Sequence, residues 1–196
     1  MKKKRIVDKI NLLIEYAAKI GATEAAEISV YEININESLA EKCREPKCEN
    51  YGLSKSCPPY VLKPSEFEKE LNKFKRAVFI RIEIPKNVLF SSENKEIFRF
   101  LHETVANMEY FAKNIGFNNA KGFAGGSCKQ LFCYNYTTCA VIDEKSKCRF
   151  PQYARESMSG FGIDIGKIVR KLGWDMDILK KADNDTANVY GMVLLK

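Results

Sequence analysis

Seven cysteines in two groups constrain this chain more than any other feature of its sequence. The spacing is C-x4-C-x5-C-x8-C in the larger group and C-x4-C-x8-C in the smaller one. The larger group is Cys128, Cys133, Cys139 and Cys148, and the smaller group is Cys43, Cys48 and Cys57. In a chain without a secretory signal, two such groups indicate bound metal before they indicate disulfides. We therefore treat all seven cysteines as candidate metal ligands.

The remainder of the sequence has the composition of a globular protein. Four of the first five residues are basic, but polar and charged residues interrupt the segment from Ile6 to Ile20, so no apolar signal core follows. The longest apolar runs are too short to cross a bilayer. We expect a cytoplasmic protein with no membrane association. We predict one metal-binding domain over residues 1–196, with cysteine-rich insertions at about 36–64 and 121–151.

The formal net charge of +7 could indicate a nucleic-acid partner, but that figure counts every cysteine as neutral. Metal-binding thiols are deprotonated, and seven thiolates around two iron–sulfur cores of charge 2+ would lower the net charge to about +4. Much of the excess of basic residues then balances thiolates. Specific nucleic-acid binding is therefore not expected.

The pattern of apolar residues predicts an α/β (α+β) protein. Apolar residues at three- and four-residue intervals predict helices, and alternating or β-branched runs predict strands. The predicted helices are about 6–20, 65–74, 93–115, 151–158 and 165–172, and the predicted strands are 27–35, 77–84 and 189–195. The last strand is apolar on both faces, which favours a central position. We expect a small mixed β-sheet packed with helices, with the two cysteine-rich loops gathered at one end.

The four-cysteine group favours an iron–sulfur cluster. Its last member opens Cys148-Arg149-Phe150-Pro151, and a proline just after a ligand keeps the loop from continuing as a helix or strand. The spacing differs from the ferredoxin pattern C-x2-C-x2-C-x3-C and also lacks the C-x2-C pairs of structural zinc sites. Zinc and free or transiently oxidised thiols therefore stay open as alternatives.

The three-cysteine group is one thiol short of a usual set of ligands. Another residue could complete a structural site, or these cysteines could be simple loop thiols. The set could also hold a cubane with one iron open to a small molecule, or a redox cluster whose fourth ligand the sequence does not identify. The sequence leaves these interpretations open.

Two arginines are candidate cofactor-binding residues. Arg149 follows a predicted ligand directly, and Arg155 lies six residues further on. A cation beside a cluster tunes its potential and can hold an anionic ligand.

Other polar and aromatic residues receive simpler interpretations. His102, the only histidine, lies on the predicted long helix and is interpreted as a partly buried surface residue. The glycine-rich run at 122–127 matches no phosphate-binding pattern and is interpreted as tight backbone beside a cluster. We expect Phe132, Tyr134 and Tyr136 to shield that cluster.

Several short motifs resemble one known family. They are Gly125-Gly126-Ser127-Cys128, Cys139, the run Cys148-Arg149-x-Pro151-x-x-Ala154-Arg155-x-Ser157-Met158, and Gly162-Ile163-Asp164-Ile165. Upstream, Cys43, Cys48, Tyr51-Gly52 and Ser56-Cys57-Pro58-Pro59 also match. These residues are similar to a family of predicted metal-binding proteins, a domain of unknown function found mostly in anaerobic archaea and bacteria. The resemblance implies metal binding through both cysteine groups, with iron–sulfur chemistry the expected form, and no settled reaction. The family more often has a tighter C-x2-C-x2-C start to the main group, so Cys139 and Cys148 match it best.

The sequence therefore predicts an iron–sulfur protein with a redox or electron-transfer role and a redox partner protein. One cluster of the 4Fe-4S type is expected on the four cysteines, and a second is possible on the three. The alternatives are an enzyme that uses an open three-cysteine cluster for small-molecule or sulfur chemistry, and a zinc-stapled interaction module. No oligomeric state is predicted.

Overall fold

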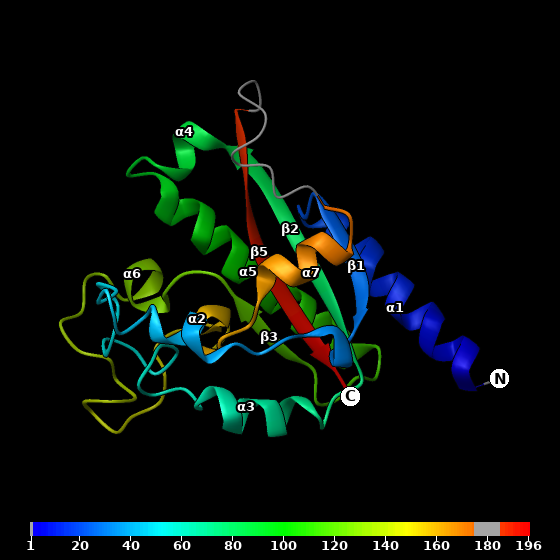
Figure 1. The fold of residues 1–196 in the computed structure, drawn as a ribbon, viewed down its shortest axis with the longest axis horizontal. Coiled ribbons are helices and arrows are strands. Elements are labelled where there is room, and N and C mark those ends of the chain that lie inside the picture. Colours follow the sequence, from blue (N-terminus) through cyan, green and yellow to red (C-terminus); the bar gives the residue numbers. More distant parts are fainter. Residues whose placement is uncertain (1, 175–184) are drawn as a thin grey trace.

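The structure is a computed structural model that describes residues 2–174 and 185–196 (Figure 1). Its α-helices are α1 (Lys2–Lys19), α2 (Glu37–Glu41), α3 (Pro64–Leu71), α4 (Lys86–Leu89), α5 (Asn94–Asn114), α6 (Cys128–Phe132) and α7 (Ile165–Lys171). Its strands are β1 (Glu24–Ser29), β2 (Arg76–Pro85), β3 (Lys121–Ala124), β4 (Glu156–Ser157) and β5 (Thr186–Leu195). Short 3-10 helices are Val30–Glu32 and Met158–Phe161.

The five strands form one mixed sheet in the order β1-β2-β5-β3-β4. Neighbouring strands are antiparallel except for β3 and β4, which are parallel. The long pair β2 and β5 forms the centre, with a register that runs from Arg76 opposite Leu195 to Pro85 opposite Thr186. The predicted α+β class with a small mixed sheet is confirmed, and so is the central position of the last strand.

Hydrophobic layers cover both faces of the sheet. Alternate residues of β2 point to opposite faces, so Val78 and Ile80 pack against α1 and α5, whereas Ala77 and Phe79 pack against α7 and the 3-10 helix Met158–Phe161. The apolar stripes of α1 and α5 complete the first layer with the buried residues Ile10, Leu13, Ala17, Leu101, Val105, Met108 and Ala112. The sheet is therefore packed with apolar side chains on both faces.

One predicted element was wrong in its extent and another in its type. The predicted strand 27–35 ends at Ser29, because the backbone N–H of Ser29 donates to the Glu32 carboxylate at 3.2 Å and the chain turns into a 3-10 helix. The predicted helix 151–158 is a turn followed by β4, because the backbone N–H of Arg155 donates to a histidine ring and Glu156 and Ser157 pair with β3. The strand β3, which overlaps the glycine-rich run, and the short helices α2, α4 and α6 were not predicted.

The β3–β4 edge of the sheet brings the two cysteine segments together. The chain leaves β3, enters α6, forms the loop of the four-cysteine group and returns as β4 beside β3. The segment that leads to the three-cysteine group is tied to the same region, since the N–H of Asn36 donates to Gly162 O at 2.7 Å and Ile35 pairs with Ile163. In Figure 1 the cyan and yellow-green loops lie on the same side of the molecule, beyond α2 and α6.

Candidate metal centre

The four cysteines of the larger group line one small cavity. Cys128 begins α6, Cys133 caps its end, and Cys139 and Cys148 lie in the loop that follows. All four border a cavity of about 20 Å³, together with the rings of Phe132 and Phe150. Cys128 is buried and the other three are half-buried. The structure therefore gathers all four predicted ligands around one enclosed space.

Polar contacts within the loop fix its shape. The Lys129 ammonium donates to the carbonyl oxygen of Cys133 at 3.0 Å and also to that of Tyr136. The backbone N–H of Cys139 donates to the Asp143 carboxylate at 2.7 Å. These bonds hold the backbone at two of the cysteines, and the cysteine side chains remain directed at the cavity that they line.

Arg149 lies within this group of cysteines. It borders the small cavity, and its guanidinium lies over the Tyr136 ring, 4.2 Å from the ring centroid. Its Nη1 donates to the carbonyl oxygen of Thr138 at 2.9 Å, and it forms an ion pair with Glu144. Burial raises the pKa of the Cys133 thiol, with a smaller contribution from Cys148, and Arg149 and Lys129 oppose that rise. The two cations therefore favour the thiolate form that metal binding requires.

The three cysteines of the smaller group face a much larger cavity of about 600 Å³. Cys43, Cys48 and Cys57 line it, and the polar side chains along its wall include Lys42, Asn50, Tyr51, Ser127, Ser157, Ser159 and Asp164. The backbone N–H of Cys48 donates to Cys43 O at 3.0 Å, which closes a turn between the first two cysteines. Burial raises the pKa of the Cys43 thiol, and the nearby Cys48 and Cys57 raise it further. The three thiols are thus close enough to influence one another.

The two cysteine groups are in direct contact. The hydroxyl of Ser56 lies 2.8 Å from Cys128 Sγ, and Cys57 Sγ–H donates to Ser127 Oγ at 3.4 Å. Burial raises the pKa of the Cys128 thiol to about 11, and its hydrogen bond to Ser56 lowers it in part. One buried wall therefore separates the small cavity from the large one.

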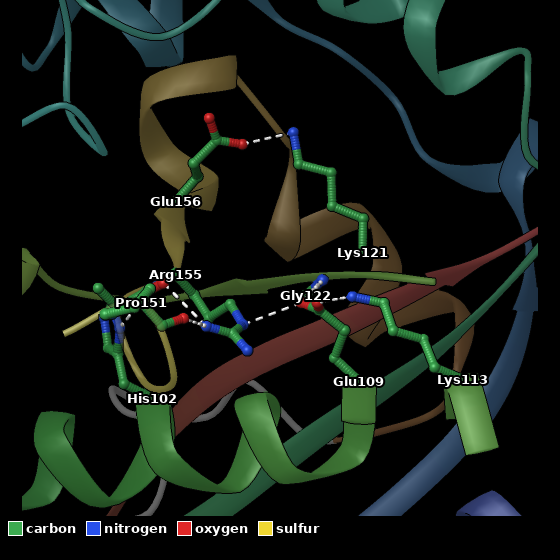
Figure 2. Close-up of polar contacts among 9 residues, drawn as sticks. His102, Glu109, Lys113, Lys121, Gly122, Pro151, Arg155 and Glu156 are labelled. Atoms are coloured by element: carbon green, nitrogen blue, oxygen red, sulfur yellow. Dashed lines mark hydrogen bonds and ion pairs between the residues drawn. The ribbon is translucent and has the colours of Figure 1, made fainter. Parts of the chain in front are cut away.

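Arg155 lies at a different place from Arg149. Its Nε forms an ion pair with Glu109 Oε2 at 2.9 Å, and its Nη1 donates to the carbonyl oxygens of Ala154 at 2.9 Å and Pro151 at 3.2 Å (Figure 2). It lines a separate cavity of about 210 Å³ with Lys121 and Glu156. Its guanidinium therefore holds the turn after Cys148 against α5.

His102 is fully buried on α5 and connects the two ends of the four-cysteine segment. Its Nε2 lies 3.0 Å from Gly125 O, and its Nδ1 accepts the backbone N–H of Arg155 at 3.2 Å. Burial lowers the pKa of His102 to about 4, so the ring is neutral and its Nε2–H donates to Gly125. The interpretation as a partly buried surface residue was wrong. The available signal was its position three residues before Val105, on the buried side of the long helix.

The predicted aromatic shield is only partly present. Phe132 is buried and stacks on Phe150 and Tyr153. Tyr134 and Tyr136 are exposed, although the Arg149 guanidinium makes a cation–π contact with the Tyr136 ring. Phe132 therefore shields the small cavity, and Tyr134 does not.

The donor atoms around the small cavity suit a thiolate-bound metal group. Among the described residues that line it, the metal-binding side chains are cysteines, with no histidine or carboxylate. Cysteine thiolates are the ligands of iron–sulfur clusters and of many structural zinc sites. Within residues 2–174 and 185–196, no set of three or more His, Cys, Asp or Glu side chains is placed to hold a single metal ion. In the same part of the chain, no helix is long and apolar enough to cross a membrane.

Comparison with known proteins gives one match. A family model described as "Predicted metal-binding protein (DUF2284)" matches residues 26–195, which include all seven cysteines. Neither the curated proteins nor the solved structures yield a match.

Proposed function

The chain belongs to the family of predicted metal-binding proteins, and from that premise we propose that its cysteine groups hold iron–sulfur clusters for electron transfer. The observation that carries this proposal is the convergence of Cys128, Cys133, Cys139 and Cys148 on one small cavity. A bound iron–sulfur cluster would supply one-electron redox chemistry at a potential set by its surroundings.

The residues around the small cavity support a redox role rather than catalysis at the four-cysteine group. The four cysteines border a small enclosed space, unlike the open cavity beside the three-cysteine group. Phe132 and Phe150 exclude water, while Arg149 and Lys129 offset the negative charge of the ligands. Such an enclosed, charge-balanced site is suited to a redox partner protein that approaches the surface of the loop.

The three-cysteine group supports a second candidate function, that of an enzyme for small-molecule or sulfur chemistry. The observation that favours it is the cavity of about 600 Å³ beside Cys43, Cys48 and Cys57. Three thiolates leave one position of a cluster for an outside ligand, and this cavity has room for one. Lys42 and the side-chain amide of Asn50 border the same space and could orient a polar ligand.

Iron and acid-labile sulfide in anaerobically purified protein test the main proposal. We expect about four iron and four sulfide for each filled cysteine group. The Cys139→Ala variant should lose the iron and sulfide bound by the four-cysteine group. The Cys43→Ala variant should lose the iron and sulfide bound by the three-cysteine group. Thr137→Ala is the matched control, because Thr137 is exposed in the same loop between Cys133 and Cys139 and should retain full content.

Other outcomes of this experiment would contradict the proposal. Colourless protein with stoichiometric zinc would instead support a zinc-stapled interaction module. Cyanide added to the iron-loaded protein separates the two remaining functions. A spectral change that occurs in the wild type but not in Cys43→Ala supports the open three-cysteine site. If the wild-type spectrum does not change, electron transfer is the function that remains.

A further inference from the structure

The two cysteine groups meet through two Ser–Cys dipeptides that are joined crosswise. Ser56 precedes Cys57 of the smaller group, and Ser127 precedes Cys128 of the larger group. Each serine hydroxyl contacts the cysteine of the other group, Ser56 with Cys128 at 2.8 Å and Ser127 with Cys57 at 3.4 Å. All four side chains are buried. The pattern is reciprocal across about 70 residues of sequence.

The backbones of both serines are held independently of their hydroxyls. The carbonyl oxygen of Ser56 accepts the N–H of Ser157 at 3.0 Å, and that of Ser127 accepts the N–H of Gln130 at 3.2 Å. Each serine backbone thus has a hydrogen bond that does not involve its hydroxyl. The reciprocal contacts of the two hydroxyls with sulfur call for another explanation.

A ligand thiolate has no proton, so each serine must then donate its O–H to the sulfur of the opposite group. A hydrogen bond to a ligating sulfur fixes its orientation and withdraws negative charge from it. Such a bond favours the more negative, reduced state and raises the reduction potential. Each group would therefore be tuned by a residue that belongs to the loop of the other.

We propose that Ser56 and Ser127 are crossed positioning residues, Ser56 for the four-cysteine centre through Cys128 and Ser127 for the three-cysteine centre through Cys57. This inference rests on the proposed metal binding by both groups. Because each serine is chain neighbour to a ligand of its own group, filling one group also orders the hydrogen-bond donor of the other. The two centres are then coupled in loading and in potential, and linkage makes that coupling reciprocal.

Four anaerobically purified variants test the crossed pattern. They are Ser56→Ala, Ser127→Ala, Ser54→Ala/Ser56→Ala and Ser159→Ala. The double variant is included because Ser54 Oγ lies 3.2 Å from Ser56 Oγ and could replace it. Ser159→Ala is the matched control, since Ser159 also lines the large cavity but is exposed. The readouts are the midpoint potential of each centre, assigned with Cys139→Ala and Cys43→Ala, and the rate of metal release to a chelator.

We expect loss of the Ser56 hydroxyl to lower the potential of the four-cysteine centre and to weaken its hold on metal by about 10- to 100-fold. Ser127→Ala should affect the three-cysteine centre in the same way, and Ser159→Ala should affect neither. Unchanged potentials and release rates, or an effect of each serine on its own loop's centre, would overturn the crossed assignment. If the metal is zinc, no potential can be measured, but the rate of metal release still tests the crossed assignment. A wild type that retains no metal would overturn the proposed function as well.

Discussion

At the scale of single residues, His102 shows how the interior supports the candidate metal centre. The imidazole joins Gly125, three residues before Cys128, to Arg155, seven residues after Cys148. It can do so only when neutral, because protonation of Nδ1 would remove the acceptor that receives the Arg155 N–H. Arg155, which forms an ion pair with Glu109, is the charged group that acts on the ring. The guanidinium also disfavours a second positive charge on the ring.

This arrangement predicts a specific dependence of stability on pH. The pKa of His102 falls from 6.5 to about 4 on folding, so the unfolded chain takes up a proton first as pH decreases. The stabilisation is complete above pH 6.5, declines between pH 6.5 and 4 by about 3 kcal/mol, and falls no further below pH 4. Denaturant unfolding of the wild type at several pH values measures this decline.

His102→Gln is the matched control for that measurement. A glutamine amide offers both an N–H donor and a carbonyl acceptor but does not titrate. Loss of metal at low pH affects both proteins and cancels in their difference. As His102 is the only histidine of the chain, equal pH slopes for the two proteins would contradict the assigned role.

At the scale of secondary-structure elements, Gly162 controls how the three-cysteine segment meets the sheet. It lies in the left-handed region at φ 72°, between the 3-10 helix Met158–Phe161 and α7. A Cβ at this position would collide with the carbonyl oxygen of Asn36, the N-cap of α2. Asn36 also donates its N–H to Gly162 O, so this contact fixes the start of the cysteine-bearing segment.

Two glycine variants separate backbone strain from this contact. Gly173 has a similar φ of 67°, but no described atom lies within 4 Å of its Cβ position. Gly173→Ala should lower the free energy of unfolding by about 1 to 2 kcal/mol, from the left-handed backbone alone. Gly162→Ala should lower it by about 3 kcal/mol or more and should also reduce metal binding at the three-cysteine group. Equal losses in thermal or denaturant unfolding would show that the Asn36 contact contributes nothing.

The elements also show which parts of the fold can be predicted from the sequence. The long helix α5 and the strands β2 and β5 have strong periodic patterns, and they were predicted nearly in full. Short elements near the cysteines were missed because tertiary hydrogen bonds define them. Glu156 and Ser157, for example, become a strand only through pairing with β3.

The same reasoning applies to the candidate site. The residue types and their grouping predicted the candidate ligands, but contacts between distant segments could not be predicted from the sequence. No spacing rule indicates that Ser56 meets Cys128, or that His102 joins Gly125 to Arg155. The roles of the seven cysteines as ligands and of Arg149 and Arg155 at a cofactor remain predictions.

At the scale of the whole molecule, the sheet edge at β3 and β4 holds a closed cavity and an open one side by side. The closed cavity is bordered by four thiols and the open one by three, and the crossed serines form part of the wall between them. This arrangement favours one composite site over two independent ones. Two centres in such a site would influence each other magnetically as well as chemically.

Electron paramagnetic resonance of anaerobically purified, dithionite-reduced protein tests the composite site most directly. We expect the wild type to show broadened or split signals from two interacting centres, and Cys43→Ala to show the simpler signal of one. Reduced wild-type protein with two independent, unbroadened signals would contradict adjacent centres, and protein that contains no iron and no sulfide would contradict iron–sulfur binding altogether.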